Sequence, residues 1–206
     1  MNLHNTAVDK LAEKIIEASF FFAEAFNSEL NENLKTEDER KEKHVYIFLE
    51  CFYFLMHLNN RTMFAKVGSE ILDRFNKEFG PLMICIVIDS FLADRSQYLP
   101  ELEKTADYIL EQLNKAEDEY SKSKDLLWDT EKHLDSLTGD SLLSKLTRNI
   151  VLHCGYELIE YKPGVKLTRN PLDIMKINLK VSDLFIFIMQ DMNFNSLVEQ
   201  VAEDIR

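Results

Sequence analysis

The segment VYIFLECFYFLMHL, residues 45–58, is apolar on every side except at Glu50 and His57. A helix that is apolar all the way round is normally buried in the core. Seven residues at 100° each bring the Glu50 and His57 side chains to within about 20° of each other, so they share one face. A buried ionisable group needs a polar partner or loses its charge. We therefore expect a core helix, and the position of its two polar side chains is the best candidate for a functional site.

The rest of the chain also favours helices over strands. It contains only five Gly and four Pro, whereas a sandwich or barrel needs many tight turns. Apolar residues spaced three and four apart predict an amphipathic helix over about residues 5–33. Thr36 followed by Glu39 predicts a capping box that opens the next helix. The apolar stretch LMICIVIDSFL, residues 82–92, is predicted to be helical because no second strand lies nearby to pair with it.

Several short motifs predict where helices begin and end. Asn59-Asn60 is expected to weaken the end of the second helix. Gly80-Pro81 is expected to end a third helix and start another, since Gly suits a C-terminal cap and Pro the first turn. Asp140-Ser141 predicts the start of a helix over LLSKLTRNIVLHCGYELIEY, followed by a turn at Lys162-Pro163-Gly164. Asn170-Pro171 predicts the start of the last long helix. The expected fold is all-α, a helical bundle of about six or seven helices.

Between Leu102 and Leu137 the apolar residues alternate between spacings of four and three. A period of 3.5 residues is typical of a seam between packed helices. It predicts one long acidic helix over about residues 100–138, weakest at Ser121-Lys-Ser-Lys124. We expect a single all-helical domain over residues 1–206, with 100–140 either inside the bundle or protruding as a helical arm.

The charge and motifs of the chain exclude several classes of protein. A formal net charge of −12 disfavours binding to nucleic acid or to anionic lipid, since both need a basic face. The N-terminal segment does not look like a signal peptide, and the longest apolar run is too short to span a bilayer. We therefore expect a cytoplasmic protein without nucleic-acid or membrane partners. The sequence contains no Gly-rich phosphate loop, no G-x-S-x-G and no H-E-x-x-H motif, which leaves enzymatic activity undecided.

Other ionisable residues also interrupt apolar runs, namely Asp89 in ICIVIDSF and His153 and Glu157 in IVLHCGYELI. Inward carboxylates and histidines from several helices are typical of dimetal sites that take iron or manganese. The candidate metal ligands are therefore Glu50, His57, Asp89, His153 and Glu157. However, the Glu-x-x-His pair of such sites is missing. Glu50 and His57 are also about 10 Å apart along the helix, so each would need its own partner from a neighbouring helix.

Arg61 lies four residues beyond His57 and extends the same face. Because a guanidinium binds a carboxylate through two hydrogen bonds, Glu50, His57 and Arg61 are candidates for binding a small anionic ligand. The alternative is a structural network in which Arg61 pairs with an acid from another helix, such as Asp89 or Asp183.

Two classes of function follow from these features. The first is a non-enzymatic interaction or adaptor protein that binds another protein, or a second copy of itself, through the heptad-patterned helix. It predicts surplus apolar area along the seam. The second is a bundle with an internal polar pocket that binds a metal ion or a small anionic ligand. It predicts that Glu50, His57 and His153 converge within a few ångströms.

Overall fold

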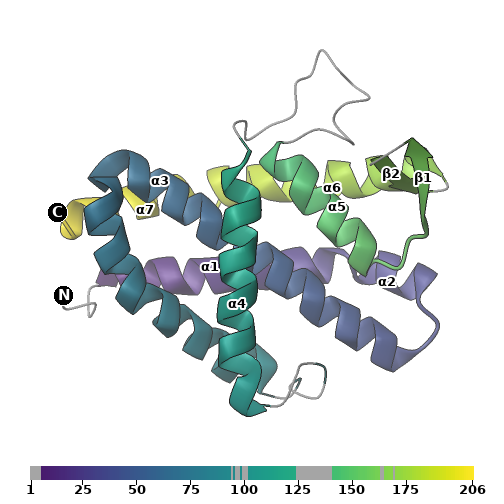
Figure 1. Ribbon diagram of the computed structural model, residues 1–206, viewed down its shortest axis with the longest axis horizontal. Coiled ribbons are helices and arrows are strands. Elements are labelled where there is room, and N and C mark those ends of the chain that lie inside the picture. Colours follow the sequence, from purple (N-terminus) through teal and green to yellow (C-terminus); the bar gives the residue numbers. More distant parts are fainter. Residues whose placement is uncertain are drawn as a thin grey trace.

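The computed structural model describes residues 6–93, 95, 98, 102–123, 141–162, 165–168 and 170–206. These residues form a helical bundle with one small hairpin, which confirms the predicted all-α class (Figure 1). The helices are α1 Thr6–Ala25, α2 Asn27–Asn33, α3 Glu37–Val87, the π-helix η1 Ile88–Leu92, α4 Leu102–Ser121, α5 Leu142–His153, α6 Pro171–Gln190 and α7 Phe194–Asp204. The strands are β1 Leu158–Lys162 and β2 Val165–Thr168.

Helix α3 is bent back on itself at Gly68, and Figure 1 shows its two halves as the arms of a V. Gly68 has φ 77° and ψ 177°, a backbone conformation that is essentially restricted to glycine. The first half carries the apolar segment, in which every residue from Cys51 to Asn59 is buried. The second half returns alongside α1 and continues into η1. The reversal at Gly68 therefore places both halves of α3 against the same N-terminal helix.

Three predicted helix boundaries are wrong. The helix predicted over residues 5–33 is interrupted at Phe26, so that α1 and α2 are separate helices. Helix α3 also continues through Asn59-Asn60 and through Gly80-Pro81. Pro81 is exposed, so the carbonyl left without an N–H partner can face water, and the proline costs less there than in a buried turn.

The predicted N-terminal caps are confirmed. The Thr36 hydroxyl accepts a hydrogen bond from the Glu39 N–H, and the Glu39 carboxylate accepts one from the Thr36 N–H, both at 3.2 Å. Ser141 and Asn170 cap α5 and α6 through their side-chain oxygens. These oxygens satisfy N–H groups that the first turn of a helix leaves unpaired.

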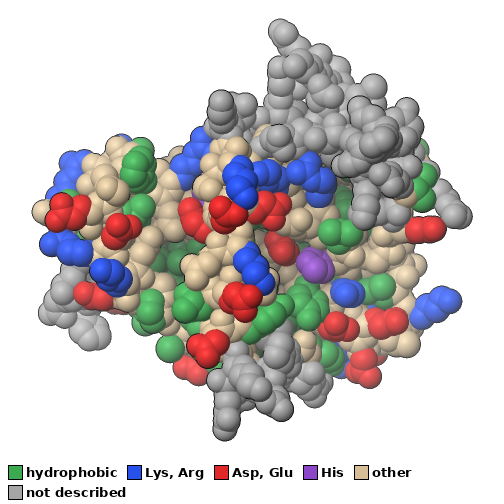
Figure 2. All heavy atoms as spheres, in the orientation of Figure 1, with side chains coloured by type: hydrophobic (Ala, Val, Ile, Leu, Met, Phe, Trp, Pro, Cys, Tyr) green, Lys and Arg blue, Asp and Glu red, His purple; other side chains and the backbone are tan. Residues whose placement is uncertain are grey.

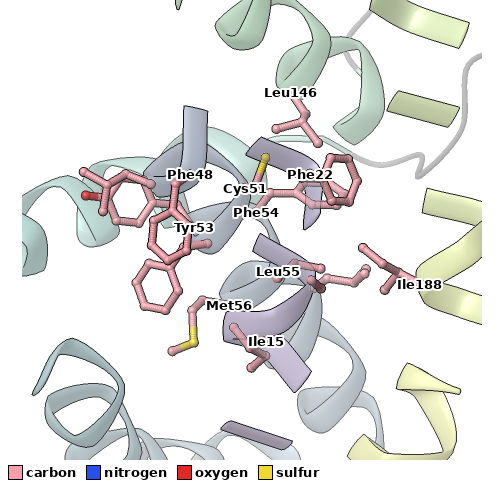
Figure 3. Close-up of a cluster of buried hydrophobic side chains, with 14 of the residues drawn as sticks. Ile15, Phe22, Phe48, Cys51, Tyr53, Phe54, Leu55, Met56, Leu146 and Ile188 are labelled. Carbon is pink, nitrogen blue, oxygen red and sulfur yellow. The ribbon is translucent and has the colours of Figure 1, made fainter. Parts of the chain in front are cut away.

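The core is formed by the apolar segment of α3 together with α1, α5 and α6. Figure 3 shows Phe22 of α1, Phe54 of α3, Leu146 of α5 and Ile188 of α6 converging in one cluster. All four side chains are fully buried. Placing the most apolar segment at the centre lets three other helices bury their apolar faces against it.

A buried carboxylate of α2 forms ion pairs with two lysines of α6. The side chain of Glu29 is 0% exposed, and it lies 2.8 Å from Lys180 Nζ and 3.2 Å from Lys176 Nζ. Burial alone would raise the pKa of Glu29. Hydrogen bonds from Lys180, Ser28 and Lys176 outweigh that effect, so its pKa lies below the ordinary 4.5. The folded protein thus holds Glu29 in its ionised form.

Helix α4 lies across the front of the molecule in Figure 1 and packs on α3. It ends at Ser121, inside the segment predicted to be its weakest point, and residues 124–138 of the predicted helix lie outside the described residues. Arg61 Nη1 donates to the Ser123 carbonyl oxygen at 3.2 Å, and Lys145 Nζ to the Glu119 carbonyl oxygen at 2.6 Å. Both cations stabilise the carbonyl end of this helix.

The helix predicted over LLSKLTRNIVLHCGYELIEY is wrong beyond His153. Gly155 has φ 77°, which ends α5, and the chain continues as β1 and β2, paired antiparallel with Ile159 opposite Leu167. Pro163 and Gly164 of the predicted turn lie outside the described residues. The alternating apolar and polar residues on either side of Pro-Gly are the signal that could have predicted this hairpin.

Candidate functional site

His57 is buried and paired with an acid that the sequence did not single out. Its ring Nδ1 lies 3.0 Å from Glu117 Oε1 of α4, and the Asn60 side chain donates to the other Glu117 oxygen at 3.3 Å. The histidine is 4% exposed. Glu117 directly follows Ala116 of the predicted seam, and charged residues beside a seam commonly pair across it. That position was the available signal for Glu117.

Glu50 finds its partners on α5 instead. The Asn149 side chain donates to Glu50 Oε2 at 3.1 Å, and His153 Nε2 lies 4.0 Å from Glu50 Oε1. Glu50 and His153 side chains are each 22% exposed, so this pair lies at the rim of the core. The expectation that Glu50 and His57 need separate partners from neighbouring helices is confirmed.

Tyr120 of α4 lies between these two pairs. Its ring packs against His57 with 5.6 Å between centroids. Its hydroxyl is fully buried, and burial raises the pKa of Tyr120 well above 10.0, with the nearby Glu50 adding to the increase and Asn149 opposing it. The result is a line of polar groups running between α3, α4 and α5, from His153 to Glu117. The Tyr120 hydroxyl has no hydrogen-bond partner within the described part of the chain. The polar groups on either side of it do pair, and we interpret those two sets of contacts as ones that fix helix register.

The remaining predicted ligands do not join this line. Asp89 lies on η1 and is exposed. Glu157 is exposed and lies beyond the end of α5, so it does not share a helix with His153. Arg61 belongs to α3, and its guanidinium binds the Ser123 carbonyl oxygen just beyond the end of α4. Within the described ranges, no group of three or more His, Cys, Asp or Glu side chains is placed to hold a metal ion.

A groove of about 710 Å³ lies between α1 and the second half of α3. One wall is a row of apolar residues on α1 spaced four positions apart, namely Ala12, Ile16 and Phe20. The opposite wall includes a row with the same spacing from α3 and η1, namely Leu82, Ile86 and Ser90. Residues spaced by four lie along one line of a helix, so the two walls run along their helices.

The charged residues that α1 contributes to the groove are all acidic. Asp9, Glu13 and Glu17 form a second row along α1, again with a spacing of four, and all three are exposed. From Asp9 to Phe20 the helix rises about 16 Å, or three turns. The groove is thus apolar and about three helical turns long, with a row of carboxylates along one edge.

Aromatic rings close one end of the groove. Phe91 of η1 stacks on the buried Phe48 with 3.7 Å between centroids, and Phe20 meets Phe91 edge-on at 6.1 Å. The Arg95 guanidinium lies over the Phe91 ring, 4.6 Å from its centroid, and donates to the Phe91 carbonyl oxygen at 2.9 Å. A π-helix such as η1 is an uncommon element that often lies at functional sites.

A second cavity of about 510 Å³ follows the groove along α1 and α2, and Arg95 lines both. This second cavity is polar, and its charged side chains include Arg40, Lys41 and Glu37 at the start of α3. His44 also lines it, with Nε2 3.1 Å from Glu24 Oε1. Burial lowers the pKa of His44 below 6.5, and although Glu24 acts in the opposite sense, the net shift is downward.

Exposed apolar side chains also gather elsewhere on the molecule. Helix α6 carries Leu172, Met175, Leu179 and Ile186, which are between 48% and 66% exposed. On the face shown in Figure 2, hydrophobic side chains lie over the second half of α3 and beside α4, between acidic and basic ones.

Comparison with known proteins adds no relationship: no family model matches the chain, and no curated protein or solved structure matches it either. No helix within the described ranges combines the length and apolar character that crossing a lipid bilayer requires.

Proposed function

We propose that this chain is a non-enzymatic interaction protein whose groove between α1 and α3 binds an amphipathic, basic helix of another protein. The observation that carries the proposal is the apolar row of α1 facing Leu82 and Ile86 across the groove, with three carboxylates along one edge. A helix that inserts apolar residues at i, i+4 and i+7 is a common occupant of such a groove. Lys and Arg on its flank would face Asp9 and Glu13, while Glu17 is paired with Lys14 of the same helix at 2.5 Å.

This proposal places the binding surface away from the heptad seam. In the described half of the seam, Ile109 and Tyr120 are fully buried, Leu113 and Ala116 pack partly buried against the core, and the small Ala106 is exposed. The seam therefore offers a partner little apolar area. By contrast, Phe20 in the groove is 42% exposed although it is aromatic. An exposed aromatic next to half-buried aliphatic residues is typical of a binding surface.

The proposed location is the cytoplasm. Cys51, Cys85 and Cys154 are free thiols, which favours a reducing compartment. Burial raises the pKa of Cys154 to about 12, so this thiol stays protonated and unreactive. This argues against nucleophilic chemistry at Cys154, whereas Cys85 is exposed.

The test uses two synthetic peptides of about 12 residues with blocked ends. One carries Leu at i, i+4 and i+7 with Lys along one flank, and the other has the same composition in scrambled order. Three buried anchors contribute about 5–9 kcal/mol before ordering costs. Because association itself costs at least about 4 kcal/mol, we expect a Kd of order 0.2–1 mM for the ordered peptide and binding at least about tenfold weaker for the scrambled one, measured by fluorescence anisotropy.

Matched protein variants locate the binding. Phe20→Ala should weaken the ordered peptide about tenfold, whereas Leu179→Ala, which truncates an exposed side chain on α6, should leave Kd unchanged. Glu13→Gln should weaken binding about threefold at low salt and less at high salt, and Glu203→Gln on α7 should have no effect. Equal binding of the two peptides, or no response to Phe20→Ala, would refute the proposed function.

A further inference from the structure

The groove and the polar cavity share one cation, Arg95. Arg95 lines both, and its guanidinium is held by the Phe91 carbonyl oxygen and the Phe91 ring. Among the residues that the structure describes, no carboxylate forms an ion pair with Arg95. Arg40 and Lys41 differ in this respect, since Glu37 lies 3.7 Å and 3.5 Å from them. Arg95 therefore keeps guanidinium N–H donors available at the end of the apolar groove.

The charges are distributed unequally along the groove. The acidic row begins at Asp9, while the only cation that lines the groove, within the described residues, is Arg95 at the end marked by Phe20 and Phe91. The N-terminus of a helix carries partial positive charge and its C-terminus partial negative charge. A bound helix is therefore favoured with its N-terminus at Asp9 and its C-terminus at Arg95.

We infer that Arg95 binds a carboxylate at the C-terminal end of the partner helix, which lies in the groove parallel to α1. The carboxylate is either the chain terminus or an acidic side chain of the last turn. This inference rests on the proposed function and adds the direction of the partner and the chemistry of its end. A guanidinium pairs with a carboxylate through two hydrogen bonds, and the polar cavity beyond Arg95 leaves room for the hydrated end of the helix.

The test compares the ordered peptide with a free C-terminal carboxylate and with a C-terminal amide, each against wild type and Arg95→Gln. For wild type we expect the carboxylate form to bind about fivefold more tightly, and for Arg95→Gln we expect the ratio to fall to about one. Arg95→Lys keeps the charge and should retain part of the preference, which separates loss of the ion pair from loss of the fold. An amidated peptide with Glu in its last turn tests whether a side-chain carboxylate can replace the terminus.

The other end provides an independent measure of direction. A free N-terminal amine should strengthen binding about twofold over an acetylated end, and Asp9→Asn should remove that gain while leaving the carboxylate effect intact. A carboxylate preference that persists in Arg95→Gln, or a carboxylate that weakens binding and does so less in Asp9→Asn, would overturn the inference. If the peptides bind with dependence on Phe20 but show no end effects, only the inference fails. If no ordered peptide binds, the proposed function itself fails.

Discussion

Gly68 determines whether α3 is one straight helix or two antiparallel arms, and Gly68→Ala tests this directly. If residue 68 were helical, alanine would stabilise the protein by about 0.4–1 kcal/mol, because it reduces the entropy of the unfolded chain. The structure instead places Gly68 at φ 77° and ψ 177°. There, any residue with a Cβ is strained by about 1–3 kcal/mol. The two interpretations therefore predict opposite signs.

The magnitude comes from the backbone alone, since a Cβ added at Gly68 would meet no atom within 4 Å. For a chain of this length, 1 kcal/mol changes Tm by about 2–4 °C, so a loss near 2 kcal/mol lowers Tm by about 4–8 °C. The assay is thermal and urea unfolding followed by circular dichroism. Ser69→Ala, at an exposed neighbour, should change stability by less than about 0.5 kcal/mol. An unchanged or raised Tm for Gly68→Ala would refute the reversal of α3.

Three further predictions concern ionisable groups. Glu29→Gln should destabilise the protein by about 1–2 kcal/mol, because it removes the ion pairs to Lys176 and Lys180, whose side chains are 45% and 32% exposed and can turn toward water. Glu32→Gln, whose side chain is 62% exposed, should cost less than about 1 kcal/mol, and chemical denaturation compares the two variants. Folding lowers the pKa of His44, so the unfolded chain takes up the proton first as the pH falls below about 6.5. The free energy of unfolding should therefore decrease as the pH falls through this range. If His44→Gln shows the same dependence of unfolding free energy on pH as wild type between about pH 7.5 and 5.5, this prediction is wrong. A double-mutant cycle with His57→Gln and Glu117→Gln should give a coupling of about 0.5–3 kcal/mol, and additive effects would mean that the two side chains do not interact.

Local patterns predicted well those features that depend on neighbouring residues. The capping box at Thr36 and the end of α4 within Ser121-Lys-Ser-Lys124 are both visible in short stretches of sequence. The burial of His57 followed from the apolar run around it. The partners of the interior polar residues could not be predicted in the same way. Glu117 lies 60 positions from His57, and nothing local specifies which distant side chain meets a given interior group.

The amino-acid sequence by itself determined the helical class, most of the helix starts and the burial of the apolar segment, because periodicity and capping act within a few residues. Tertiary structure alone decided the groove. The rows through Ile16 and Glu13 are readable on α1, but the wall that faces them comes from the second half of α3. That wall stands opposite α1 only because Gly68 adopts a backbone conformation that side-chain patterns do not encode, and because the core that the two arms bury in common stabilises the reversal.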